Sequence, residues 1–203
     1  GINTGLFSPY KNDRDRLAEY ADPAKKTVLF VSRLVWEKDI ETLSIVYKKL
    51  MRERPDVQLI ITGNGPQYNV LKKMLPGVIF TGKLIKDDLA RVYAFADVFI
   101  FPSPTETFGN VVLESLSSGV PAVVAAQGGP KGIVEHGKTG YHAETKNVDD
   151  FYQKIIKILD DEELRRRMGN SAREYALSQS WDQLAERMFT YYEGKEAEVS
   201  ITV

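Results

Sequence analysis

Short apolar runs alternate with stretches of helical spacing along most of this chain. Runs of four to six apolar and β-branched residues predict buried strands, and apolar residues recurring every three or four positions predict helices. The predicted strands cover residues 27–32, 57–62, 78–81, 98–101 and 121–125, with a last short strand near Tyr141. The predicted helices cover residues 40–51, 67–74 and 87–96, then a helix from 111 until Gly119 and Pro121, and helical sequence from 148 to 192 with breaks near 160 and 178–180. Residues 128–130 are expected to form a loop.

Strands that alternate with helices predict a parallel sheet with right-handed crossovers. The expected fold class is α/β, a Rossmann-like doubly wound parallel sheet with closing C-terminal helices. We divide the chain into a linker over 1–26 with one short helical turn and a charged patch over 11–16, a Rossmann-like domain over 27–180, and a closing helix and tail over 181–203. Ligands bind such sheets where strand order reverses, and strands 27–32 and 98–101 are the expected neighbours of that point.

Composition narrows the class of protein. The chain has 203 residues, of which 43% are hydrophobic and 27% are charged, as in a globular domain with a substantial core. A formal net charge of -1 argues against nucleic acid as a partner. The absence of cysteine excludes disulfides and cysteine nucleophiles and fits a cytoplasmic protein. No apolar run approaches the length of a membrane span, we expect no signal peptide, and the start without methionine fits a piece of a longer protein.

The stretch from Ser103 to Glu114 carries the strongest candidate chemistry. It joins a predicted strand to a predicted helix, with Gly109 at or near the helix start. The first amides of a helix lack internal partners and attract anions, and glycine lets a ligand approach the backbone. Glu106 and Glu114 flank this point, so the stretch suits a ligand that is part phosphate and part polyol, such as a sugar nucleotide. The alternative is that Glu106 is a solvated or capping residue and Glu114 an ordinary surface glutamate.

Two cations follow the first predicted strand. Arg33 and Lys38 could neutralise a diphosphate, although two solvated loop cations are the simpler interpretation. Gly63-Asn64-Gly65 could begin a dinucleotide motif, but Tyr68 stands at the third glycine position, and a plain turn explains the pattern equally well. The two histidines, at positions 136 and 142, sit in no ligand-like cluster, so no metal site is expected.

The key stretch has the pattern Pro-Ser-x-x-Glu-x-Phe-Gly-x-x-x-x-Glu-x-x-x-x-Gly-x-Pro. It is made by Pro102, Ser103, Glu106, Phe108, Gly109, Glu114, Gly119 and Pro121. This pattern resembles the signature of retaining GT-B glycosyltransferases, most closely glycosyltransferase family 4. The resemblance extends over essentially the whole chain, as the C-terminal, donor-binding half of such an enzyme.

The resemblance implies a retaining transfer of a hexose-type sugar from a UDP- or GDP-sugar donor to an unknown acceptor, which could be a glycan, a lipid or a small molecule. It implies no cofactor and no metal, and an N-terminal acceptor domain of the same protein, without which this half is expected to be inactive. It also implies a cytoplasmic location, with peripheral contact to the inner face of the membrane as an option through the missing half.

The resemblance also implies roles for individual residues. Glu106 would be the catalytic residue, positioning the transferred sugar or supporting positive charge at its anomeric carbon. The implied nucleotide-sugar-binding residues are Arg33 and Lys38 at the diphosphate, Gly63 where the donor approaches, Leu84 in the loop on the base, the amides of Phe108, Gly109, Asn110 and Val111 at sugar hydroxyls or phosphate, and Glu114 at the ribose hydroxyls.

The chain departs from the family pattern at Asp39, where glycine is frequent, and at Gly132, where many members have glutamate. As a helix cap, Asp39 would compete with phosphate for the same amides. Two other classes remain open. One is another GT-B sugar-nucleotide enzyme, such as a 2-epimerase or a glycogen or sucrose synthase-like protein. The other is a non-catalytic module that binds protein or nucleic acid.

Overall fold

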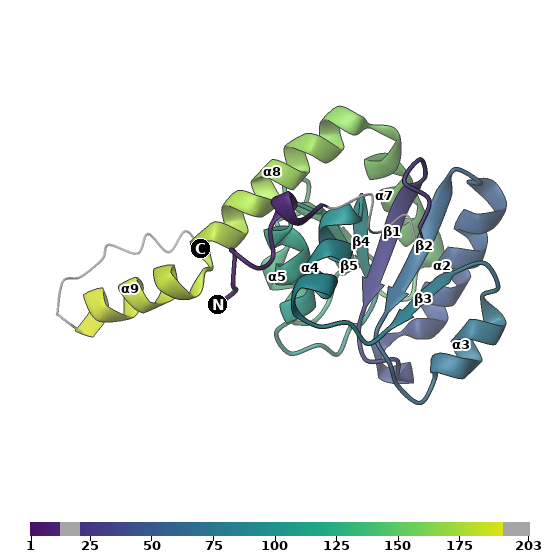
Figure 1. Ribbon diagram of the computed structural model, residues 1–203, viewed down its shortest axis with the longest axis horizontal. Helices are drawn as coiled ribbons and strands as arrows, with labels where there is room; N and C mark the ends of the chain where they lie inside the picture. The colour runs from purple at the N-terminus through teal and green to yellow at the C-terminus, as the bar shows by residue number, and fades with distance from the viewer. Residues whose placement is uncertain (13–20, 193–203) are drawn as a thin grey trace.

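Six strands form one parallel sheet in the order β3-β2-β1-β4-β5-β6 (Figure 1). The computed structural model describes residues 1–12 and 21–192. The strands are β1 (Lys26–Val31), β2 (Val57–Thr62), β3 (Ile79–Gly82), β4 (Val98–Phe101), β5 (Ala122–Ala125) and β6 (Gly140–Ala143). Strand order reverses between β1 and β4, which pair directly. The α/β class and the position of the switch point are therefore confirmed.

Helices cover both faces of the sheet. They are α2 (Ile40–Glu53), α3 (Tyr68–Met74), α4 (Lys86–Phe95), α5 (Asn110–Ser117), α6 (Gly129–Ile133), α7 (Val148–Asp160), α8 (Glu162–Ser178) and α9 (Trp181–Tyr192), with 3-10 turns η1 (Pro9–Lys11) and η2 (Trp36–Lys38). α2 packs with α7, and α4 packs with α5. α8 continues from α7 and packs along α5, so it links the two helical layers (Figure 1).

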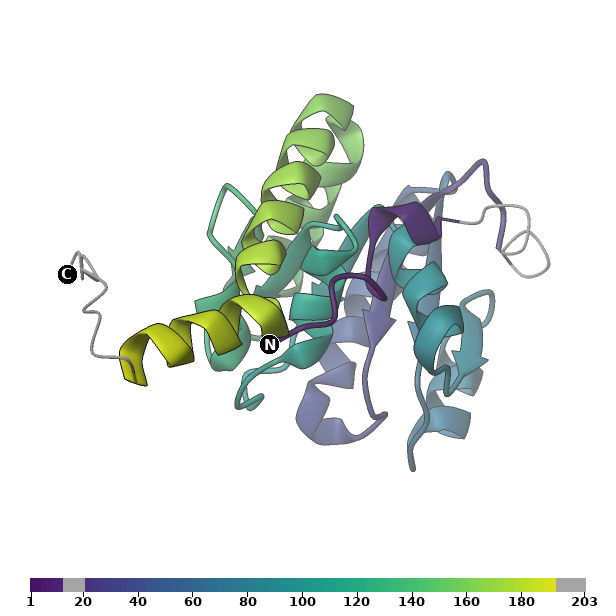
Figure 2. The same cartoon turned by 60° about the vertical axis from the view of Figure 1, so that its left-hand side comes forward.

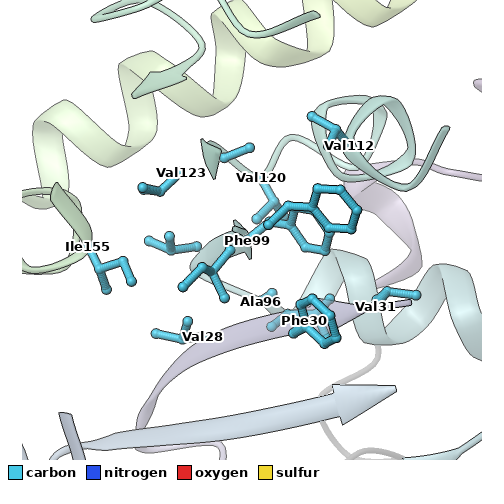
Figure 3. Packing of buried hydrophobic residues seen from close by; sticks show 14 of the residues in the cluster. Val28, Phe30, Val31, Ala96, Phe99, Val112, Val120, Val123 and Ile155 are labelled. Atoms are coloured by element: carbon cyan, nitrogen blue, oxygen red, sulfur yellow. The ribbon is translucent and has the colours of Figure 1, made fainter. Parts of the chain in front are cut away.

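The core lies between these layers. Figure 3 shows strand side chains such as Phe99 between Val112 of α5 on one side and Ile155 of α7 on the other. Phe99 and Phe101 stack at 6.2 Å between ring centroids, and Phe30 stacks on Phe101 at 6.1 Å. These side chains are fully buried, as expected for strands whose runs are apolar on both faces. The rigid core holds the carboxyl ends of β1 and β4 side by side.

Most predicted elements are confirmed to within a few residues, including the helix breaks near 160 and 179. The predicted loop over 128–130 is wrong, because α6 begins at Gly129 with Pro130 in its first turn, where proline's fixed φ suits a helix start. Asp39 is confirmed as a helix cap, since its carboxylate accepts from the amide of Thr42 at 3.4 Å. It does so in the left-handed region, at φ 52°.

The predicted closing helix exists as α9, but it projects from the body of the domain (Figures 1 and 2). None of its residues is buried, and Trp181 and Met188 are 63% and 58% exposed. The start of the chain packs beside the α8–α9 junction, where the amide of Ile2 donates to the carbonyl of Gln179. The proposed domain boundaries stay a prediction. The tail over 193–203 and the part of the charged patch over 13–16 lie outside the described residues.

Candidate functional site

An open cleft of about 700 Å³ lies at the carboxyl ends of β1, β2 and β3. Its walls come from the loops after these strands and from the first turn of α5. Its lining includes four of the predicted binding residues, Arg33, Gly63, Leu84 and Val111. The cleft therefore occupies the edge of the sheet where a doubly wound fold binds its ligands.

The lining of this cleft is positive. Arg33 and Lys83 both line it, and no carboxylate does so among the residues that the structure describes. No role is predictable for Lys83 from the sequence, because a lysine in a turn carries no signal of which group its side chain faces. Leu84, Leu89 and Val111 supply apolar surface to the lining, and residues 62–66 supply a loop with polar groups. An apolar wall with a few placed cations suits a ligand with a flat ring and an anionic group.

Gly63 has a structural reason to be glycine besides any contact with a ligand. Its φ is 132°, and a Cβ atom there would lie 1.9 Å from the carbonyl oxygen of Ser32. Gly65 is similarly close to Leu34, whose carbonyl oxygen would lie 2.4 Å from an added Cβ. The two glycines thus allow the loops after β1 and β2 to pack backbone to backbone, which forms the floor of the cleft.

The start of α5 is open to an anion. Gly109 is the N-cap in the left-handed region, at φ 92°, and no side chain caps the helix in the described structure. The first amides of α5, at Asn110 and Val111, lie at the positive end of the helix dipole. Gly109 also packs against Pro130 of α6, because an added Cβ would lie 3.0 Å from Pro130 Cγ. The prediction that glycine stands at the helix start is confirmed.

Lys38 and Glu106 form an ion pair across the switch point. Lys38 Nζ donates to Glu106 Oε2, although 68 residues separate the two in the chain. Their side chains are 20% and 27% exposed, so water screens the pair only in part. Both residues were predicted to lie near one ligand, and the structure brings them together. A contact between the two side chains was not predicted.

Glu114 is held by a residue that the sequence did not point to. The hydroxyl of Tyr93, a buried residue of α4, donates to Glu114 Oε2 at 2.9 Å. Burial raises the pKa of Glu114 to about 7, against the opposing effect of the Tyr93 hydrogen bond. Glu114, Asn110 and Phe108 also line a second cavity of about 460 Å³ beside the first residues of the chain and Trp181.

The raised pKa of Glu114 predicts how the free energy of unfolding depends on pH. A group whose pKa is raised on folding adds stability that is fully present below its unfolded pKa, near 4.5, and is lost as pH rises through about 7. Glu114→Gln keeps an acceptor for Tyr93 but does not ionise. The free energy of unfolding of the variant, relative to wild type, should therefore rise between pH 5 and pH 8 in urea titrations. If this difference in the free energy of unfolding did not change with pH, the raised pKa of Glu114 would be contradicted. Tyr93→Phe removes a hydrogen bond that lowers the pKa of Glu114, so the pH at which wild-type stability is lost should rise in that variant.

No group of three or more His, Cys, Asp and Glu that could hold a metal ion occurs in the part of the chain that the structure describes. The two histidines contact each other instead. The amide of His142 donates to His136 Nδ1 at 3.0 Å, and His142 Nε2 lies 2.7 Å from the carbonyl oxygen of Val134. Within the same described ranges, no helix is both long and apolar enough to cross a membrane.

Comparison with known proteins identifies the family. The model of the family described as glycosyl transferases group 1 matches residues 11–175. The sulfoquinovosyl transferase SQD2 of Arabidopsis thaliana is 36% identical over 188 residues, which cover 89% of this chain and 36% of that protein. A GDP-mannose-dependent alpha-mannosyltransferase of Mycolicibacterium smegmatis is 32% identical over 193 residues, 95% of this chain and 50% of that one. The chain thus spans about a third to a half of the length of these curated relatives.

Solved structures agree on the fold. A sucrose-phosphate synthase from Thermosynechococcus elongatus superposes with a TM-score of 0.82 at 28% identity, over 96% of this chain and 51% of that one. The C-terminal domain of a glycosyl transferase group 1 family protein, LpcC from Francisella tularensis, gives 0.78 at 19% identity, over 88% of this chain and 97% of that domain. The likeness to LpcC concerns the fold alone. On the extent of the family match, this chain belongs to the glycosyl transferases group 1 family.

Proposed function

We propose that this chain is the donor-binding half of a retaining GT-B glycosyltransferase of glycosyltransferase family 4. It would bind a nucleoside diphosphate sugar and transfer a hexose-type sugar to an acceptor held by a further, N-terminal domain of the same protein. The observation that carries the proposal is the positive cleft after β1, β2 and β3, which reaches the uncapped start of α5 on the other side of the switch point. Cations and free amides converge there, as a diphosphate requires.

We base the placement of the donor on the roles that the family resemblance implies. Leu84 and Val111 line the cleft, whereas Glu114 lines the second cavity. The base would lie against Leu84 and Val111, and the ribose hydroxyls would donate to Glu114. The diphosphate would take the amides of α5 together with Arg33 and Lys38. Metal-independence is part of this proposal, since these cations would neutralise the leaving diphosphate in place of a metal.

The proposed chemistry breaks the bond between the anomeric carbon and the diphosphate oxygen. The acceptor hydroxyl forms the new bond on the same face of the sugar, and its proton passes to the departing phosphate oxygen. Lys38 would exchange its partner on donor binding, from Glu106 to the diphosphate. Glu106 would then be free to orient the sugar and to stabilise positive charge at the anomeric carbon.

Another sugar-nucleotide enzyme of the same architecture, such as a 2-epimerase or a synthase, is the second candidate. The superposition with a sucrose-phosphate synthase over 96% of this chain supports this second candidate. Both candidates use the same donor site, so the reaction would be decided by groups outside this chain. We accordingly propose that the isolated chain binds donor weakly and transfers no sugar.

Calorimetric titration of this chain with GDP, UDP and ADP, each with and without magnesium, tests the proposal. GDP comes first, because a relative 32% identical to this chain is named as GDP-mannose-dependent. We expect saturable binding of one diphosphate without magnesium, and a loss of about tenfold in affinity for Glu114→Ala, the size expected for the loss of two net hydrogen bonds. Flat titrations with all three nucleotides, in this chain and in a longer protein that includes the preceding domain, would contradict it.

A further inference from the structure

Two hydroxyl groups tie the loop that carries Glu106 to the loop that carries Lys38. Thr105 Oγ1 donates to the carbonyl oxygen of Glu37 at 3.0 Å, and Ser103 Oγ donates to the same oxygen at 3.3 Å. The two hydroxyls lie 3.5 Å apart. One backbone carbonyl, next to Lys38 in the chain, thus accepts two hydrogen bonds from the opposite side of the switch point.

This carbonyl belongs to the peptide group that joins Glu37 to Lys38. The other end of the same group, the amide of Lys38, donates to the carbonyl of Val35 at 3.1 Å. The next residue, Asp39, is in the left-handed region and caps α2. Because both ends of the peptide group are bonded, its plane is fixed, and this plane sets the direction in which the Lys38 side chain leaves the backbone.

A buried hydroxyl needs a partner, so Ser103, which is fully buried, would form some hydrogen bond in any case. Thr105 is different, because it is exposed and water could satisfy its hydroxyl. It nevertheless bonds the same carbonyl as Ser103. Thr105 directly precedes Glu106, and Ser103 lies three positions before it, so the bonds that orient Lys38 and the carboxylate that it meets belong to one segment.

We propose that Ser103 and Thr105 are positioning residues for Lys38. Their bonds to the Glu37 carbonyl hold the Lys38 loop against the Glu106 loop, which aligns Lys38 with the diphosphate of the bound donor. The inference deepens the proposed function and rests on it. It assigns part of the diphosphate affinity to two side chains that do not touch the ligand.

The test compares Thr105→Val with Thr105→Ser in this chain, by calorimetric titration with GDP and UDP. Valine keeps the shape of threonine and removes the donor, whereas serine keeps the donor. We expect Thr105→Val to lose about fivefold in affinity, the size of one net hydrogen bond, and Thr105→Ser to recover the wild-type value. Adding Ser103→Ala to Thr105→Val should deepen the loss.

A second comparison separates positioning from a general effect on the fold. If Thr105 acts through Lys38, Thr105→Val should cause no further loss of affinity in a Lys38→Ala background. An undiminished fivefold loss there would overturn the inference. So would wild-type affinity in Thr105→Val, while the proposed function would stand. Failure of the wild-type chain, alone and with the proposed N-terminal domain, to bind any of GDP, UDP and ADP would overturn both.

Discussion

Glu106→Gln should tighten the binding of GDP or UDP to this chain by about tenfold, although the same change should abolish sugar transfer in the complete enzyme. In the structure Lys38 is paired with Glu106, so under the proposed function a diphosphate would have to displace a carboxylate to reach it. The neutral amide of glutamine competes far less well for the ammonium group. A hydrogen bond to a charged group contributes about 1.5–3 kcal/mol, and 1.4 kcal/mol corresponds to a tenfold change in affinity.

Calorimetry on the wild type and the variant measures this effect directly. Glu37→Gln is the matched control, because it removes the same charge from an exposed side chain beside Lys38. The control should change affinity by less than about twofold at 0.15 M salt, where exposed charges are screened. Equal tightening in both variants would show a general charge effect, and weaker binding by Glu106→Gln would contradict the exchange of partners at Lys38.

Gly63→Ala should destabilise the domain by about 3–5 kcal/mol, or prevent folding altogether. The added Cβ would lie 1.9 Å from the carbonyl oxygen of Ser32, a backbone atom that cannot rotate away, and the residue has a φ of 132°. Relief would require β1 and β2 to separate where their loops form the floor of the cleft. This is the largest change in stability that we expect from a single methyl group at the site.

The control for this substitution is Gly132→Ala. Gly132 lies within α6, and no atom lies within 4 Å of its added Cβ, so alanine should be neutral or slightly stabilising. Urea titrations of both variants give the free energies of unfolding. A loss below about 1 kcal/mol for Gly63→Ala would mean that the two loops can move apart, and that the glycine serves ligand approach alone.

The pattern of the sequence was sufficient to predict the layers of this protein. Apolar runs such as Val98–Phe101 are buried strands because they are apolar on both faces, which only a sheet covered by helices on both sides can satisfy. The loop over 128–130 was predicted wrongly because glycine and proline favour turns, yet proline also fits the first turn of a helix. Local propensity alone does not distinguish the two cases.

For the site, the sequence by itself determined which residues follow the strands at the switch point. Arg33, Lys38 and Glu106 could be placed at one edge of the sheet, because parallel strands end on the same side. The tertiary structure alone decided how these residues pair. The Lys38–Glu106 contact joins residues 68 positions apart, and Tyr93 reaches Glu114 from another helix. The hydrogen bond that the Glu37 carbonyl accepts is made by the backbone, so the pattern of side chains cannot predict it. Such contacts depend on side-chain directions and loop paths that are fixed only when the whole core packs.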